Sequence, residues 1–166
     1  TASSAITPAA PLTAPGAPTG VSGTPGNGQV DLSWTAPASN GGSAITGYTV
    51  TPYIGATAQT PATFNSTLTT QTVIGLTNGT AYTFRIRAIN SAGTSASSSA
   101  STAVTPKAVT SAPTSVTGTF GNAQVALSWT APSTDNGSAI TDYLIQYSTN
   151  GGTSWQTWAH TASTAT

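Results

Sequence analysis

The chain of 166 residues contains no cysteine and no glutamate, and only 4% of its residues are charged. Without cysteine, disulfide bonds and thiolate chemistry are excluded. The formal net charge is zero, so the basic surface that binds nucleic acid or anionic membranes is missing. The chain also lacks the run of about eighteen apolar residues that a membrane-spanning helix needs. We therefore expect no nucleic-acid partner and no membrane insertion.

The shortage of charge also limits the possible catalytic sites. Carboxylate-based hydrolysis needs two acids beside one bond, but Asp31 lies far in sequence from Asp135 and Asp142. His160 is the sole histidine, and although serine is abundant, a Ser–His–Asp site is not favoured. Asp135, Asn136 and Asp142 could offer oxygen ligands to calcium, yet a solvated loop is the simpler interpretation. We expect a non-catalytic protein with no metal and no cofactor.

The dominant feature that is present is an internal repeat. The stretch 29–37 alternates apolar and polar residues before a proline, and it returns almost unchanged at 124–132. Alignment of residues 17–51 on 112–146 gives 22 identities in 35 positions without a gap. Alternation with a period of two is typical of strands with one buried face. One β-domain is therefore the repeating unit.

Seven short strands separated by turn residues are expected in the first repeat. The Asn78-Gly79 pair favours a tight reversal before a long alternating strand. The expected strands are Gly20–Gly23, Gln29–Thr35, a strand from Ile45, a short edge strand around Tyr53, Gln71–Leu76, Tyr82–Ala88 and Ser95–Thr105. This pattern, with no helical period, predicts an all-β, immunoglobulin-like, seven-stranded antiparallel sandwich, repeated in tandem.

The repeat suggests a domain plan. Residues 18–106 form the complete domain, 9–17 and 107–112 are linkers, and 113–166 hold the first strands of a second domain. In that second domain, residues 147–155 resemble a hairpin that follows the third strand. Residues 1–8 resemble 99–106, so we interpret them as the last strand of a preceding domain. A Thr/Ala tail that matches by composition is the alternative.

The spacing of the apolar residues resembles that of a fibronectin type III domain. The sequence resembles bacterial, actinobacterial-like extracellular versions of this domain more than animal ones. The motif comprises Val30-x-Leu32-x-Trp34, Ile45-x-x-Tyr48-x-Val50 and Leu76-x-x-Gly79-x-x-Tyr82-x-Phe84-x-Ile86. The resemblance implies that Trp34 lies in the core and that Tyr82 forms a tyrosine corner. Trp129 takes the place of Trp34 in the second repeat.

Residues 113–166 contain no second copy of the motif around Tyr82. Half a sandwich exposes its core face and unpaired sheet edges, which is unfavourable in water. Two interpretations stay open. The chain is a segment of a longer array, or another chain completes the fold.

Exposed aromatic and glycosylation sites are the remaining candidates. Trp155 and Trp158 have no counterpart in the first repeat and could stack on sugar rings; the alternative is that they cover a sheet edge or a neighbouring domain. Asn65 and Asn136 begin Asn-x-Ser/Thr triplets that could accept glycans.

Three functions fit these observations. The first is a structural repeat or spacer of an extracellular bacterial surface protein, sheath or filament, with neighbouring domains or identical subunits as partners. The second is an accessory spacer or carbohydrate-binding region of a secreted polysaccharide-degrading enzyme. The third is a decoration domain of a phage virion protein. A cell-surface glycan is a further possible partner.

Overall fold

The computed structural model describes residues 10–166, so the strand expected at residues 1–8 lies outside the described residues. Every regular element between residues 10 and 166 is a β-strand. Within this part of the chain, no helix is long and apolar enough to cross a membrane. The chain divides into two units, the first ending at Lys107 and the second spanning Ala108–Thr166.

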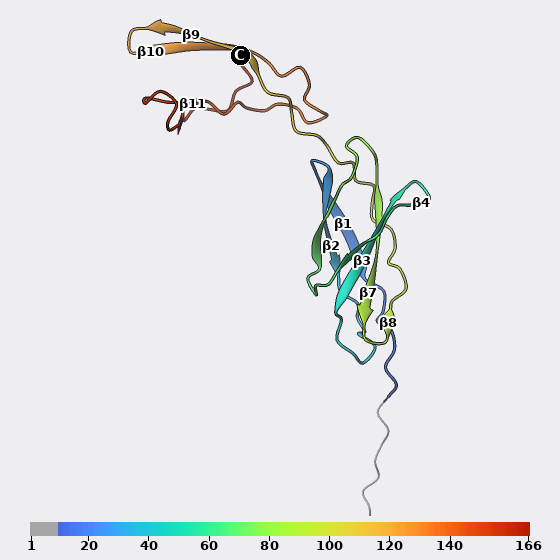
Figure 1. Ribbon diagram of the computed structural model, residues 1–166. Coiled ribbons are helices and arrows are strands. Elements are labelled where there is room, and N and C mark those ends of the chain that lie inside the picture. The colour runs from blue at the N-terminus through green and yellow to red at the C-terminus, as the bar shows by residue number, and fades with distance from the viewer. Residues whose placement is uncertain (1–9) are drawn as a thin grey trace, which may run out of the picture. The chain divides into compact units, whose positions relative to one another are not determined.

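The first unit is a sandwich of two antiparallel sheets, shown in Figure 1. One sheet has the order β1-β2-β6, and the other has the order β4-β3-β7-β8 with β5 also paired to β3. The strands are β1 Thr19–Gly26, β2 Gln29–Thr35, β3 Gly47–Ile54, β4 Thr57–Ala58, β5 Ala62–Phe64, β6 Thr70–Ile74, β7 Thr83–Asn90 and β8 Gly93–Thr94. The predicted all-β antiparallel architecture is thereby confirmed.

Alternation in β2, β3 and β7 builds the core of the first unit. In β7, Phe84, Ile86 and Ala88 are fully buried while the residues between them face outward. The core cluster consists of Val30, Leu32, Trp34, Tyr48, Val50, Val73, Tyr82, Phe84, Ile86, Ala88 and Val104. Burial of this set removes apolar area from water, which is the main force that holds the two sheets together.

Two strand predictions were wrong in detail. Tyr53 does not mark a separate edge strand, because β3 continues through it to Ile54 and the edge is formed by β4 and β5. The expected strand Ser95–Thr105 is also not regular. After β7, regular pairing is limited to β8, which pairs with β7, and to the bridge between Tyr82 and Val104.

Serine side chains replace the regular ladder between residues 95 and 101. The backbone N–H groups of Ser95, Ser98 and Ser101 donate to the carbonyls of Ala88, Ile86 and Phe84. In return, each serine Oγ accepts from the backbone N–H of the same β7 residue, at 2.9–3.0 Å. Three residues of this segment therefore span the distance that two residues span on β7. We call Ser95, Ser98 and Ser101 the serine ladder.

The segment expected to be a linker before the first domain is partly attached to it. Thr13 N–H donates to the carbonyl of Gly41, and Gly16 N–H donates to that of Ser39, both at 2.9 Å. Pro15 is buried in the same stretch. Residues 13–16 thus contact the loop between β2 and β3.

The second unit repeats the start of this arrangement. Its strands are β9 Thr114–Gly121, β10 Gln124–Thr130, β11 Gln146–Tyr147 and β12 Gln156–Thr157. β9 pairs with β10, and β11 pairs with β12 to form the hairpin expected at residues 147–155. The backbone bond from Trp129 N–H to the carbonyl of Thr166 matches the bond from Trp34 N–H to Thr69. Because Thr69 directly precedes β6, Thr166 lies at the position where β6 begins in the first unit.

Candidate functional site

Trp34 lies in the core of the first unit, as the family resemblance implies. Its ring meets Tyr48 edge to face, with the centroids 5.0 Å apart and the planes at 69°. The indole Nε1 is buried and has no hydrogen-bond partner among the described residues. The ring is therefore held by packing alone and is not available to a ligand.

Tyr82 bonds back to the turn that precedes it. Its hydroxyl oxygen accepts from the backbone N–H of Thr77 at 3.1 Å, which is the contact that defines a tyrosine corner. The backbone of Tyr82 also exchanges two hydrogen bonds with Val104. Both contacts hold the start of β7 in place, so the role of Tyr82 is structural.

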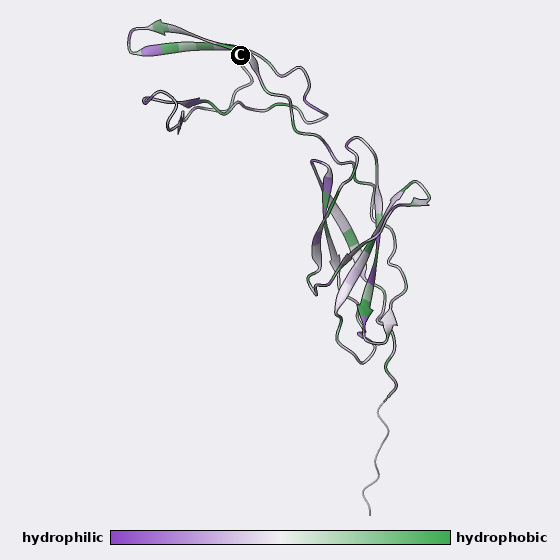
Figure 2. Ribbon diagram, in the orientation of Figure 1, coloured by the Kyte–Doolittle hydropathy of each residue, from purple (hydrophilic) through white to green (hydrophobic). Residues whose placement is uncertain are grey.

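Trp129 repeats the packing of Trp34 in the second unit. It meets Tyr143 at 5.1 Å and 72°, and its Nε1 is likewise without a partner among the described residues. The rest of this apolar face is open, however. Figure 2 shows strongly hydrophobic residues along β10, and Val125 and Leu127 are 52% and 42% exposed.

A hollow of about 930 Å³ lies over this face. Its apolar lining includes Val125, Leu127, Trp129, Ile145 and Trp158. We call the apolar surface that lines this hollow the open core face. Sequence reasoning anticipated an exposed core face, but it did not place Trp158 on it.

Trp155 directly precedes β12 and Trp158 directly follows it. Trp158 lines the open core face and meets Tyr147 edge to face at 6.5 Å. Trp155 is 60% exposed and does not line the hollow. Trp158 is itself 57% exposed, so both rings are accessible and they differ in their surroundings.

The turn next to Trp155 is held by its own polar side chains. Asn150 Oδ1 accepts from Ser154 N–H, and Asn150 Nδ2 donates to Ser154 Oγ, both at 2.9 Å. Ser148 Oγ accepts from the N–H of Gly152 at 2.8 Å. These bonds order the hairpin and set hydroxyl and amide groups close to an exposed indole ring.

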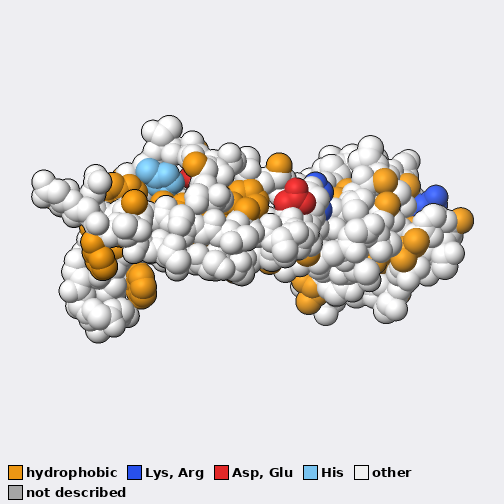
Figure 3. Space-filling view, turned by 90° about the horizontal axis from the view of Figure 1, so that it is seen from above, with side chains coloured by type: hydrophobic (Ala, Val, Ile, Leu, Met, Phe, Trp, Pro, Cys, Tyr) orange, Lys and Arg blue, Asp and Glu red, His pale blue; other side chains and the backbone are white. Residues whose placement is uncertain are grey.

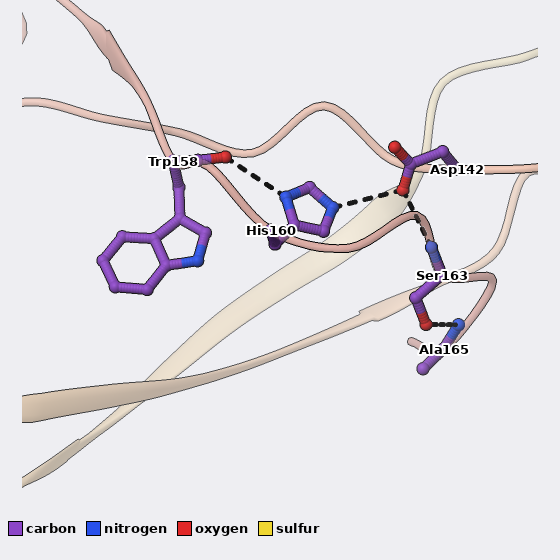
Figure 4. A network of polar contacts seen from close by, with 5 residues as sticks. All are labelled: Asp142, Trp158, His160, Ser163 and Ala165. Carbon is purple, nitrogen blue, oxygen red and sulfur yellow. Dashed lines mark hydrogen bonds and ion pairs between the residues drawn. The ribbon is translucent and has the colours of Figure 1, made fainter.

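A surface network joins Asp142, His160 and Ser163, as Figure 4 shows. His160 Nε2 lies 3.1 Å from Asp142 Oδ1, and its Nδ1 lies 3.1 Å from the carbonyl oxygen of Trp158. Asp142 Oδ1 also accepts from the backbone N–H of Ser163. The hydroxyl of Ser163 instead accepts from Ala165 N–H. The network thus holds a chain segment and does not direct a serine hydroxyl at the imidazole.

The network shifts the titration of both ionisable groups. The Trp158 carbonyl, followed by Asp142, raises the pKa of His160 above its ordinary 6.5. The Ser163 N–H, with further backbone and His160 contributions, lowers the pKa of Asp142 below 3.8. The contribution of His160 is fully present below pH 6.5 and is lost as pH rises through its raised pKa. The contribution of Asp142 is present above pH 3.8 and is lost as pH falls through its lowered pKa.

We expect Asp142→Asn to lower the pKa of His160, because the substitution removes the acceptor charge but keeps the Trp158 carbonyl. The measurement is a titration of the His160 ring protons by NMR in the wild-type chain and in the variant. Asp135→Asn is the matched control and should leave the titration unchanged. An identical curve for wild type and D142N would show that the contact does not persist in solution.

The other candidate residues occupy separate places. Asp135 Oδ1 accepts from Gly137 N–H, whereas Asp142 belongs to the His160 network. No group of three or more histidine or acidic side chains comes together within residues 10–166. The side-chain amide of Asn136 donates to the carbonyl of Val109, while Asn65 is exposed just after β5. Of the two glycosylation candidates, Asn65 has the more accessible position.

A model of the fibronectin type III domain family matches residues 16–104. Chitinase A1 of Niallia circulans is 46% identical over 115 residues, which are 64% of this chain and 15% of the relative. Exoglucanase A of Cellulomonas fimi is 39% identical over 153 residues, which are 84% of this chain and 16% of the relative. The chain thus spans less than a fifth of these curated relatives.

Solved structures give the same fold. Domains A168–A170 of titin align with a TM-score of 0.52 and 35% identity, covering 55% of this chain and 32% of that one. The FN1–FN3 domains of chicken CNTN1 align with a TM-score of 0.52 at 24% identity, over 87% and 51% of the two chains. The second likeness extends into the second unit and concerns the fold alone. The chain therefore belongs to the fibronectin type III family, whose domain is non-catalytic.

Proposed function

We propose that this chain is an extracellular accessory region of a bacterial polysaccharide-degrading enzyme, in which its domains act as spacers. The observation that carries this proposal is the identity of 46% and 39% to segments of a chitinase and an exoglucanase. These relatives favour an enzyme-associated spacer over the sheath or filament that the sequence suggested first. They offer no support for a virion protein.

The structure is compatible with a spacer. Figure 3 shows few charged side chains on the face it presents. The first unit is closed around its own core. Such a surface has little electrostatic attraction for other macromolecules, and separate domains in series keep their neighbours apart.

The test is to isolate the native protein with an antibody raised against residues 10–166. Peptide sequencing and intact mass then identify what flanks these residues. A glycoside-hydrolase domain on the same polypeptide, with glycan-hydrolysing activity in the isolated protein, is the expected result. Flanking sequence typical of a polymerising sheath or of a capsid protein would contradict the proposal.

Within this proposal, Trp155 is the residue expected to contact glycan. We predict that Trp155→Ala weakens retention of the chain on insoluble chitin or cellulose roughly tenfold, equal to about 1.4 kcal/mol, because a stacked indole face is lost. Trp158→Ala is the comparison variant, and we expect it to cause the smaller loss of the two because that ring also packs edge to face on Tyr147. Retention is measured by depletion from the supernatant. Equal retention of wild type and W155A would remove Trp155 from glycan recognition.

A further inference from the structure

Asparagine is followed directly by glycine at five places in the chain, and each pair lies in a connection between two strands. All five glycines have positive φ. Such pairs are chemically labile, because a glycine nitrogen has no neighbouring side chain to hinder its attack on the asparagine carboxamide. The attack closes a five-membered imide ring and releases ammonia. The pairs are Asn27-Gly28, Asn40-Gly41, Asn78-Gly79, Asn136-Gly137 and Asn150-Gly151.

In four of the five pairs, the N–H of the glycine already donates a hydrogen bond. A donated N–H keeps its proton more firmly, because the hydrogen bond stabilises the neutral amide over its anion. Its nitrogen is therefore a poor nucleophile. The acceptors are Asn78 Oδ1 for Gly28 at 2.8 Å, Ser39 Oγ for Gly41 at 3.2 Å, the Pro106 carbonyl for Gly79 at 2.8 Å and Asp135 Oδ1 for Gly137 at 2.9 Å.

The fifth pair, Asn150-Gly151, lies in the turn between β11 and β12 and differs from the other four. The N–H of Gly151 has no acceptor among residues 10–166. Asn150 and Gly151 are both exposed, so water reaches the pair. The nitrogen that must lose its proton and attack is thus left free at this pair.

The carboxamide of Asn150 is also held in a way that favours the attack. Its Oδ1 accepts from the N–H of Ser154 and from the hydroxyl of Ser148, both at 2.9 Å. Two donors aimed at this oxygen stabilise the negative charge that develops on it when Cγ is attacked. Asn150 Nδ2 lies 2.9 Å from Ser154 Oγ, so a hydroxyl that can relay a proton stands beside the nitrogen that leaves.

We propose that Asn150 is a site of non-enzymatic deamidation, converted in the folded chain to aspartate and isoaspartate. The Gly151 nitrogen gives up its proton and bonds to Cγ of Asn150, the bond from Cγ to Nδ2 breaks, and Nδ2 leaves as ammonia with a proton in exchange. Water then opens the imide. Opening at the Cγ carbonyl gives aspartate, and opening at the backbone carbonyl gives isoaspartate, whose main chain runs through Cγ. Water is the sole co-reactant.

The conversion changes the hairpin that carries Trp155. It adds a negative charge to a chain whose formal net charge is zero, and it removes the amide that donates to Ser154. The ring of Trp155 lies against Gly152, where an added Cβ would meet its Cζ2 at 3.8 Å. The new carboxylate therefore arises close to the exposed indole. This modification does not depend on the proposed spacer function.

The test is to incubate the full chain of 166 residues at mildly alkaline pH and to digest samples with an acid protease. Mass spectrometry then follows the one-dalton mass increase at each asparagine. We expect Asn150 to convert at least tenfold faster than the asparagines of the other four pairs. In concentrated urea the five rates should converge, because the hydrogen bonds that distinguish the pairs are lost. Equal rates in the folded chain, or an unchanged lead of Asn150 in urea, would overturn the proposal.

A variant in the first unit tests the cause of the selectivity. Ser39→Ala removes the acceptor of the Gly41 N–H but keeps the bond from the Gly42 N–H to Asn40 Oδ1 at 3.0 Å. Conversion of Asn40 should become at least threefold faster, while the rate at Asn150 stays the same. Ser99→Ala, at an exposed serine, is the control and should change neither rate. An unchanged rate at Asn40 in S39A would overturn the role given to the glycine N–H.

Discussion

Replacing Phe84 with alanine is expected to lower the free energy of unfolding of the first unit by about 3–5 kcal/mol. Phe84 is fully buried near the start of β7, where it packs near Tyr82 with the ring centroids 6.3 Å apart. The substitution removes apolar contacts and leaves a cavity that the two sheets cannot close. Because a small domain is stable by only about 5–15 kcal/mol in total, the loss is a large share.

The measurement is urea unfolding followed by the NMR signals of Tyr48 and Ile86 in the core of the first unit. Ile74→Ala is the matched control, because Ile74 lies in the sheet β1-β2-β6 and is 74% exposed. It should change the free energy of unfolding by no more than about 0.5 kcal/mol. Similar effects of the two substitutions would mean that the packing around β7 is not the source of stability.

The strands of the first unit were largely predictable, because alternation carries most of the information in a sandwich. The stretch Val30-x-Leu32-x-Trp34 was assigned to residues 29–35, and β2 has these bounds. The long strand after Asn78-Gly79 was also anticipated. In both strands, a clear turn signal stands next to a row of apolar residues buried on one face.

Edge segments were less predictable, because they bury few side chains and their sequence pattern is weak. The stretch after Tyr53 contains mostly Thr, Ala and Gln, and it forms the short strands β4 and β5. The serine ladder was missed for a different reason. Its signal is a serine at every third position from 95 to 101, but so many serines surround it that the period is hidden.

The residues of the candidate site could be predicted from the sequence, but the directions of their side chains could not. Both Trp155 and Trp158 were selected because the first repeat has no counterpart for them. Which ring faces the core depends on the register of β11 with β12, and a two-residue strand leaves no alternation in the sequence from which to read it. The structure supplies that register: Trp158 lines the hollow beside β10 and Trp155 does not.

Ser98→Ala is expected to lower the free energy of unfolding of the first unit by about 1–3 kcal/mol, the cost of a buried donor left without its acceptor. Ser98 is 4% exposed, and its Oγ accepts from the N–H of Ile86 at 2.9 Å and donates to the carbonyl of Ser99 at 2.8 Å. The segment advances three residues for every two on β7, and the acceptor for the Ile86 N–H is the Ser98 hydroxyl and not a backbone carbonyl. The same reasoning applies to Ser95 and Ser101, and the triple alanine variant should lose more than any single variant.

Ser99→Ala is the control, because Ser99 is exposed and only its backbone carbonyl takes part in the ladder. Hydrogen exchange adds a readout specific to the mechanism, since Ser98→Ala should speed the exchange of the Ile86 amide more than that of Val50 on β3. A variant S98A that unfolds at the wild-type urea concentration, with the Ile86 amide still protected, would show that the hydroxyl is not the acceptor. Faster exchange of that amide would show how an irregular segment covers the edge of β7. The hydroxyls of Ser95, Ser98 and Ser101 accept from three N–H groups of β7, where a regular strand would offer backbone carbonyls.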